Sequence, residues 1–299
     1  MPEGADTVIQ QELIESNDET GTISYYKDKI DPGSNVRLKG SQCKEGDLIL
    51  KSGTLITPGA IGLLASVGVS KVATYSLPSV GCIITGDEIK EVGSTLKEGE
   101  IYNSNGPMLE AFLNEVGILN TTHYRATDDK DELQKVMDEA LQKHDFLLLS
   151  GGISVGDYDF VKQCLEKAGV KELFYKIKQR PGKPLFAGKK DNKWIFALPG
   201  NPASVLSCFN LYVKPCLKFR LGFDNVWSPG QILPLREDQL KKQGFTFFLK
   251  GRIDGGEIKI LDGQQSFNLQ AFNTANCLVE LEEQNEIVEM GTPVKVYNL

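Results

Sequence analysis

Histidine and tryptophan are scarce in this chain, with two of each among 299 residues. The two histidines, His123 and His144, stand apart, and no pair of cysteines has the Cys-x-x-Cys spacing. A zinc site needs a cluster of such ligands, and a serine–histidine–aspartate triad needs a histidine between its partners. The sequence therefore argues against a zinc enzyme and against a triad hydrolase.

Long apolar runs are missing as well. None approaches the ~20 residues that a membrane-spanning helix needs, and the acidic start, Met1 to Asp6, lacks the apolar core of a signal peptide. The six cysteines are scattered, mostly in apolar surroundings, as is typical of buried free thiols. We therefore expect a cytoplasmic protein without a membrane span.

Basic residues are also outnumbered by acidic ones, 33 to 40, which gives a net charge of −7. An acidic surface repels nucleic acid unless a basic patch is segregated, so we expect no nucleic-acid partner. One short basic stretch runs from Lys176 to Lys183. It is too short for a duplex but suits one or two phosphate groups.

The first of three regions, residues 1–77, has no regular alternation of strands and helices. Short strands are predicted at 23–26 and 35–38, and a helix at 60–67, begun by Thr57-Pro58. These pieces do not make a complete domain, which indicates a partial N-terminal β/α region.

The second region, residues 78–223, alternates apolar strands with amphipathic helices. This rhythm predicts a doubly wound, mostly parallel α/β sheet. Pro215 is expected to kink the last helix. The predicted strands cover 81–84, 118–124, 146–149 and 194–198, and the predicted helices cover 107–116, 131–143, 160–168 and 203–221. The third region, 224–299, has short strands and glycine turns, which predict a small all-β barrel domain.

A glycine-rich loop, Ser150 to Asp159, follows a buried strand of the second region. In open α/β sheets ligands bind beyond the carboxyl ends of the strands. Glycines allow positive φ and a close approach of backbone N–H groups to an anion, and serine hydroxyls can donate to phosphate. The expected contacts are Ser150, Gly151, Gly152 and Ser154. The alternative is a tight turn whose Asp157 or Asp159 only caps the next helix.

Two proline-containing loops lie at other strand ends. In Pro199-Gly200-Asn201-Pro202, Asn201 is a good N-cap and Pro202 a good first helical residue. The N–H groups of that terminus would suit an anion, although simple helix initiation explains the pair too. In Arg180-Pro181-Gly182-Lys183-Pro184, a rigid turn presents two cations, with Lys176 and Lys178 before it. We expect phosphate binding there, and Lys178 alone could be a solvated charge.

Carboxylates form a further group, in Thr85-Gly86-Asp87-Glu88 and Asp128-Asp129. Acids at sheet ends can hold Mg²⁺ through its waters or accept from the donors of a heterocycle. The alternative for Asp128-Asp129 is a helix N-cap. In the third region, Arg252 and Gly263 to Ser266 read as a strand end and a polar loop.

Taken together and in this order, these stretches resemble the molybdopterin molybdenumtransferase family, known as MoeA in bacteria and as the C-terminal domain of gephyrin in animals. The resemblance covers nearly the whole chain. The residues on which it depends are Thr85 to Glu88, Ser104-Asn105, Ser150 to Asp159, Pro181 to Pro184, Pro199 to Pro202 and Ala275-Asn276-Cys277. Gly4-Ala5-Asp6 and Leu63 to Gly68 in the first region also match family segments.

The resemblance implies a reaction: molybdate is inserted into adenylylated molybdopterin with release of AMP, assisted by Mg²⁺. It also implies a homodimer. The implied catalytic acids are Glu88, Asp128 and Asp159; the implied metal ligands are Asp87, Glu88 and Asp159; and the implied substrate contacts are Ser150, Gly151, Gly152, Ser154, Lys176, Arg180, Lys183, Pro199, Asn201, Pro202, Arg252 and Ser266.

Two departures from the family favour an alternative. Family members carry a segment before Gly4-Ala5-Asp6, with an Asp-Gly-Tyr-Ala motif, so the chain resembles an N-terminally shortened member. Where the family has Gly-Glu-Asp, this sequence has Gly40-Ser41-Gln42, and an amide does not replace a carboxylate. The alternative is a gephyrin-like, non-catalytic scaffold that binds a protein or peptide in a groove between the second and third regions.

Overall fold

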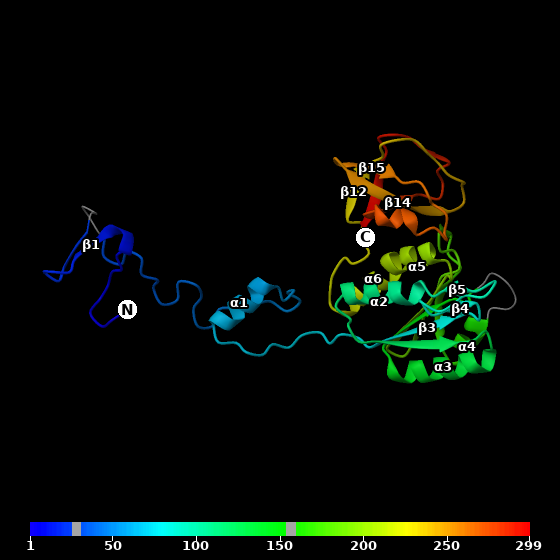
Figure 1. Ribbon diagram of the computed structural model, residues 1–299, viewed down its shortest axis with the longest axis horizontal. Coiled ribbons are helices and arrows are strands. Elements are labelled where there is room, and N and C mark those ends of the chain that lie inside the picture. The colour runs from blue at the N-terminus through cyan, green and yellow to red at the C-terminus, as the bar shows by residue number, and fades with distance from the viewer. Residues whose placement is uncertain (26–30, 154–159) are drawn as a thin grey trace. The chain divides into compact units, whose positions relative to one another are not determined.

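The computed structural model describes residues 1–25, 31–153 and 160–299. The chain divides into two compact units, Met1–Ala73 and Thr74–Leu299. The second unit contains both the α/β region and the C-terminal strands (Figure 1). Its helices are too short or too polar to cross a membrane, and the same holds for the other described helices.

The first unit holds little regular structure. A 3₁₀ turn, η1 (Gln11–Leu13), precedes a hairpin of β1 (Ile14–Asn17) and β2 (Thr22–Tyr25). Helix α1 (Pro58–Ser66) begins where predicted, because the Thr57 hydroxyl accepts a hydrogen bond from the Ala60 N–H. The strand predicted at 35–38 is wrong. Asn35 has a φ of 58° and belongs to a turn, so its backbone cannot continue as an extended strand.

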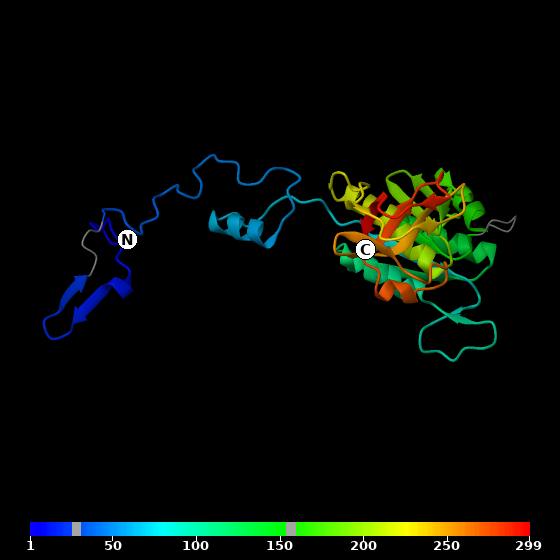
Figure 2. The ribbon, with the colours of Figure 1, turned by 90° about the horizontal axis from the view of Figure 1, so that it is seen from above.

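The predicted α/β sheet is confirmed, with strand order β6-β3-β7-β11-β10-β8. The first four strands are parallel; β10 runs antiparallel to β11, and β8 runs antiparallel to β10 and so in the direction of the first four. Their bounds are β6 (Thr121–Ala126), β3 (Val80–Thr85), β7 (Phe146–Ser150), β11 (Lys193–Leu198), β10 (Phe186–Lys190) and β8 (Lys171–Tyr175). The small pair β4 (Ile89–Lys90) and β5 (Ile101–Tyr102) lies beside this sheet (Figures 1 and 2).

Helices cover both faces of the sheet, as the continuous apolar strands predict. In β7, Leu147 and Leu149 pack with α3 (Lys130–Lys143) and α4 (Phe160–Lys167). Phe146 and Leu148 point the other way, into the core formed with α2 (Asn105–Glu115) and the last helical segment. Figure 1 shows these two helical layers above and below the strands.

The last helical segment is interrupted before Pro215. It consists of α5 (Pro202–Cys208), a π-helical turn η2 (Phe209–Val213) and α6 (Lys214–Arg220). A proline ring clashes with the carbonyl four residues earlier and lacks an N–H to donate. In the π turn the Lys214 N–H donates to the Phe209 carbonyl five residues earlier, so the helix departs from regular α geometry just before Pro215.

The C-terminal strands form one antiparallel sheet of order β12-β18-β16-β14-β15. A bridge between Leu235 and Ile258 joins its two edge regions, so the expected barrel is a curled sheet whose described strands do not close by a continuous ladder. The strands of this sheet are β12 (Gln231–Pro234), β18 (Pro293–Asn298), β16 (Cys277–Leu281), β14 (Thr246–Asp254) and β15 (Glu257–Ile260). Outside it, β13 (Gln239–Leu240) pairs with β17 (Ile287–Val288), and η3 (Gln270–Asn273) is a 3₁₀ turn.

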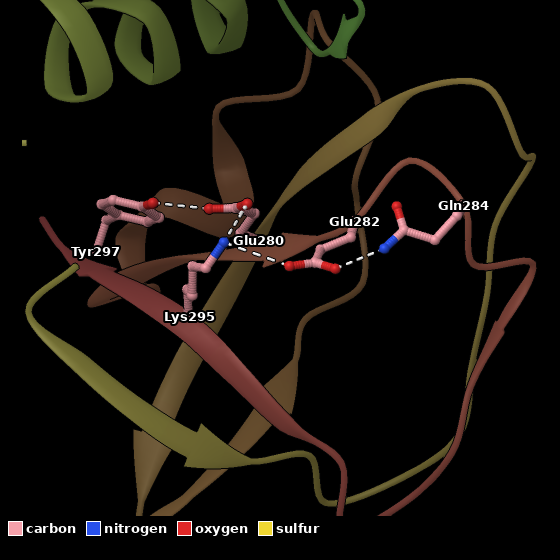
Figure 3. Close-up of polar contacts among 5 residues, drawn as sticks. All are labelled: Glu280, Glu282, Gln284, Lys295 and Tyr297. Carbon is pink, nitrogen blue, oxygen red and sulfur yellow. Dashed lines mark hydrogen bonds and ion pairs between the residues drawn. The ribbon is translucent and has the colours of Figure 1, made fainter. Parts of the chain in front are cut away.

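Charged side chains link neighbouring strands on this sheet (Figure 3). The Lys295 ammonium on β18 lies 3.1 Å from Glu280 and 3.3 Å from Glu282, and the Tyr297 hydroxyl donates to Glu280 at 2.7 Å. The hydrogen bond to Glu280 raises the pKa of Lys295. The network holds β18 in register with β16.

Candidate active site

A cavity of about 1020 Å³ lies in the second unit, between the carboxyl ends of the parallel strands and the C-terminal sheet. Its wall combines loops that are far apart in the sequence: Gly151-Gly152, Arg180 to Pro184, Pro199 to Pro202 and Gln264 to Phe267. Lys183 and Asn201, predicted to share one pocket, both line it. The predicted Ser154 and Asp159, and Asp157, lie outside the described residues.

The glycine loop approaches its neighbouring strand very closely. Gly151 has a φ of 95°, and a Cβ at this position would lie 2.1 Å from the Thr85 carbonyl oxygen. Only glycine therefore fits between the ends of β7 and β3. Ser150 is buried behind the wall, where its hydroxyl accepts from the Asn105 side chain at 2.9 Å. Ser150 therefore contacts Asn105 and is not part of the wall, whereas Gly151 and Gly152 face the cavity. The substrate contact of Ser150 stays a prediction.

The cationic turn is fixed from behind by a buried amide. Gln179, in the short strand β9 (Gln179–Arg180), donates to the Pro181 carbonyl at 2.8 Å and accepts from the Tyr212 hydroxyl at 2.5 Å. Burial raises the pKa of Tyr212 well above its ordinary value, so this hydroxyl stays a donor. Strand β9 also pairs with β14, which ties the turn to the C-terminal sheet.

The cations of this turn differ in their surroundings. Arg180 stacks 4.7 Å from the centre of the Phe245 ring and lines the cavity with Lys183, which has no ion pair in the described part of the chain. Lys178 pairs with Glu283 at 2.9 Å and does not line the cavity. Lys176 lies over the Tyr175 ring and is likewise not part of the cavity wall.

The start of α5 meets the loop of the C-terminal sheet. Asn201 is the N-cap but its side chain does not cap the helix, because its Nδ2 donates to the Ser266 hydroxyl at 2.9 Å. The Ala203 N–H donates to the Ser266 carbonyl at 3.1 Å. The N–H group expected to meet an anion is therefore used within the protein. Pro199, Asn201, Pro202 and Ser266 all line the cavity, whereas Arg252 on β14 does not.

Of the predicted acids among the described residues, one borders the cavity. Glu88 lines it, whereas Asp87 and Asp128 do not. The Asp128 N–H donates to Asp87 at 3.4 Å, and the Thr85 hydroxyl donates to Asp128 at 3.1 Å. Asp129 caps α3, so the N-cap alternative holds for Asp129 alone. Within 1–25, 31–153 and 160–299, no three potential metal ligands gather at one point.

Two buried polar residues, one in the cavity wall and one bonded to a loop of that wall, were not among the predicted site residues. Asn105 is 6% exposed and donates to the Gly200 carbonyl at 2.8 Å, and its Oδ1 has no hydrogen-bond partner among the described residues. Lys250 is a strand lysine whose ammonium is bonded to the loop that carries Ser266. The alternation of polar residues in β14 gave no signal for Lys250, because its partners lie in a loop further along the chain.

Comparisons with known proteins agree with the resemblance seen in the sequence. The molybdopterin molybdenumtransferase of Staphylococcus aureus strain Mu50 is 35% identical over 99% of this chain and 71% of its own length. The chain belongs to the molybdopterin molybdenumtransferase family. The Haemophilus influenzae member is 35% identical over 99% of this chain and 74% of its own length. A crystal structure of the MoeA protein from Pyrococcus horikosii superposes with a TM-score of 0.76 at 32% identity, covering 98% of this chain and 72% of that one.

Three family models divide the chain. The MoeA N-terminal region (domain I and II) matches residues 1–68, the probable molybdopterin binding domain matches 81–218, and the MoeA C-terminal region (domain IV) matches 233–299. The cavity is lined from the second and third of these segments. Gln42, in the first, donates to the Ser66 hydroxyl of α1 at 2.7 Å.

Proposed function

We propose that the protein acts in molybdenum cofactor biosynthesis, where it inserts molybdate into adenylylated molybdopterin and releases AMP. The observation that carries this proposal is the single cavity that combines a glycine loop, a cationic turn and a carboxylate. These are the groups that a site needs in order to bind a phosphate-bearing ligand and an oxyanion. Membership in the family supplies the reaction.

The cavity favours binding of the pyrophosphate portion of such a substrate. Arg180 and Lys183 reach it from a turn that is held by Gln179, so little conformational freedom is lost when an anion binds. Cleavage of a pyrophosphate depends chiefly on positioning and on neutralising the developing charge. The two cations provide the charge, and the backbone of Gly151 and Gly152 permits close approach.

We assign Mg²⁺ to Asp87, Glu88 and Asp159. Mg²⁺ is usually held by one or two carboxylates together with waters and substrate phosphates. Glu88 lines the cavity and supplies one carboxylate of this mode. Asp87 does not line the cavity, and Asp159 lies outside the described residues. When bound, the ion would neutralise phosphate charge. Asp128 is assigned to the same group of acids, because its backbone N–H donates to the Asp87 carboxylate.

The test is AMP release by the purified protein, supplied with adenylylated molybdopterin, molybdate and Mg²⁺. Lys183→Ala removes a cation from the cavity wall and should lower kcat/KM by about 10- to 100-fold. Lys178→Ala is the matched control, because Lys178 lies on the same stretch but pairs with Glu283. Absence of AMP with the unaltered chain, or equal losses in both variants, would contradict the proposal. The scaffold alternative gains no specific support from the described residues, and we do not adopt it.

We further infer a homodimer from the first unit. Of its described apolar residues, only Ala60 and Leu64 are buried, whereas Ile23, Leu38, Leu48, Leu55 and Ile61 are exposed. These exposed apolar side chains are distributed along a unit that has little core of its own. A second copy of this chain, as the family resemblance implies, would cover them.

A cytoplasmic location agrees with the cysteines, all six of which are free thiols. Five are buried, and burial raises the pKa of Cys82 to about 12. Such thiols are unreactive and fill the core.

A further inference from the structure

Lys250 is almost completely buried, with 2% of its surface exposed. Its ammonium donates to three backbone carbonyls: Gly263 at 2.7 Å, Asn268 at 2.6 Å and Gln265 at 3.1 Å. An ammonium has three N–H donors, so each finds an acceptor. All three acceptors belong to one loop, residues 263–268, which we call the Ser266 loop.

The backbone of Lys250 is bonded to the same loop. Its N–H donates to Gln264 Oε1 at 2.9 Å, and its carbonyl accepts from Gln264 Nε2 at 2.9 Å. The Ser266 loop is therefore fastened to β14 by five hydrogen bonds at one residue. Other bonds that reach the loop from outside include two from the start of α5, from Asn201 Nδ2 and from the Ala203 N–H to Ser266.

Burying a charge is costly unless it is hydrogen-bonded. Burial lowers the pKa of Lys250, and the bonds in which its ammonium takes part are to neutral carbonyls. A methionine would fill this space without that cost. We therefore look for the role of Lys250 in the Ser266 loop, to which its ammonium is bonded.

The Ser266 loop forms one wall of the cavity. Gln264, Gln265, Ser266 and Phe267 line it, and Ser266 contacts both Asn201 and Ala203 at the start of α5. The Ser266 hydroxyl accepts from Asn201, so its proton remains available for an anionic ligand. A shift of the loop would displace this hydroxyl and release the Ala203 N–H.

We propose that Lys250 is a positioning residue, whose ammonium holds the Ser266 loop against α5 and so presents the Ser266 hydroxyl at the cavity wall. Lys250 itself does not line the cavity. This role deepens the proposed function and rests on it only for the ligand measurement described below.

Hydrogen exchange tests the positioning without any ligand. In Lys250→Met, backbone amides of residues 263–268 and of Ala203 should exchange at least 10-fold faster than in the unaltered chain. Lys250→Arg, which restores several charged donors, should recover most of the protection. The matched control is Lys241→Met. Lys241 is also buried, at 8% exposed, but its ammonium donates to the Phe245 and Glu283 carbonyls, away from the Ser266 loop.

Unchanged exchange of the loop in Lys250→Met, or equal acceleration there in Lys241→Met, would overturn the proposal. Should Lys250→Met fail to fold, Lys250→Gln takes its place. The glutamine amide keeps two N–H donors without a buried charge, so its loop should exchange at an intermediate rate, and wild-type exchange in this variant would refute the role.

Inorganic pyrophosphate is the ligand probe. Its dissociation constant, measured by calorimetry, should rise about 10-fold in Lys250→Met and stay within twofold in Lys241→Met. If the unaltered chain bound no pyrophosphate, the proposed function would be wrong, while the exchange data would still decide the role of Lys250.

Discussion

At the scale of single residues, Gly182 shows how tightly the cationic turn is built. It has a φ of 98°, and an added Cβ would lie 2.4 Å from Cys208 Sγ and 2.9 Å from Gln179 Nε2. Both neighbours are buried and cannot move away freely. Gly182→Ala should therefore lower the free energy of unfolding by about 3 kcal/mol, adding overpacking to the cost of the left-handed backbone.

The control for this substitution is Gly244→Ala. Gly244 has a φ of 88°, but an added Cβ would meet nothing within 4 Å. Only the backbone cost applies, about 1 kcal/mol. Urea unfolding of both variants gives the comparison. Equal losses in the two variants would show that the packing around Gly182 contributes nothing.

Single residues also show where sequence reasoning succeeds and where it stops. The glycine and proline motifs could be recognised in the sequence, because the backbone conformations that they require are local, and they line the cavity. The contacts of Ser150 and Lys250 were not foreseen, because their partners, Asn105 and the Ser266 loop, lie far along the chain or in irregular structure. A buried polar side chain has no local signature, since its burial is decided by what packs over it.

At the scale of elements, Asp145 joins the starts of β3 and β7. Its carboxylate accepts from the Ser79 N–H at 2.9 Å and from the Ser79 hydroxyl at 2.8 Å. Burial opposes ionisation of Asp145, but the bonds from Ser79 outweigh it and lower the pKa below its ordinary value of 3.8. A lowered carboxyl pKa adds stability above the unfolded-state value, and that stability is lost as the pH falls through the folded-state value.

Asp145→Ala should accordingly cost about 1 kcal/mol at pH 7, allowing for solvent screening of a half-buried group. The difference from the unaltered chain should shrink as the pH falls below 3.8. Thermal unfolding at several pH values measures it. Asp224→Ala, at an exposed position, should show neither effect. A difference that stayed constant through this pH range would disprove the role of the ionised carboxylate.

Some strands could be predicted from the sequence and others could not. The strands β3, β7 and β11 were predicted because burial on both faces leaves a continuous apolar run. β8, with the sequence Lys-Glu-Leu-Phe-Tyr, is exposed over its first three residues, and no such run marks it. The edge position of β8 and its antiparallel pairing with β10 follow from the tertiary structure, and so does the curl of the C-terminal sheet.

At the scale of the whole molecule, the α/β sheet and the C-terminal sheet are joined into one unit. Strand β9 adds to β14, and the Thr246 N–H donates to the Lys178 carbonyl at 2.9 Å. Leu211, Phe248 and Leu278 form a shared core between them. The cavity wall is therefore continuous across the junction, and the two sheets are expected to unfold together.

The first unit lacks such a core, and we therefore expect it to pack against a second copy of the chain. The chain, of 32.9 kDa, should sediment as a dimer of about twice that mass at micromolar concentration. Ile61 on α1 is 57% exposed, and if a second copy covers this surface, Ile61→Lys buries an unpaired charge. We expect it to shift the equilibrium toward the monomer by at least 10-fold.

Ile232→Lys is the matched control for this prediction. Ile232 is 64% exposed on β12, in the second unit, and gains the same charge. Sedimentation equilibrium of the three proteins separates a specific interface from a general effect of charge. A monomeric unaltered chain, or equal dissociation by both variants, would show that the apolar surface of the first unit is not covered by a second copy.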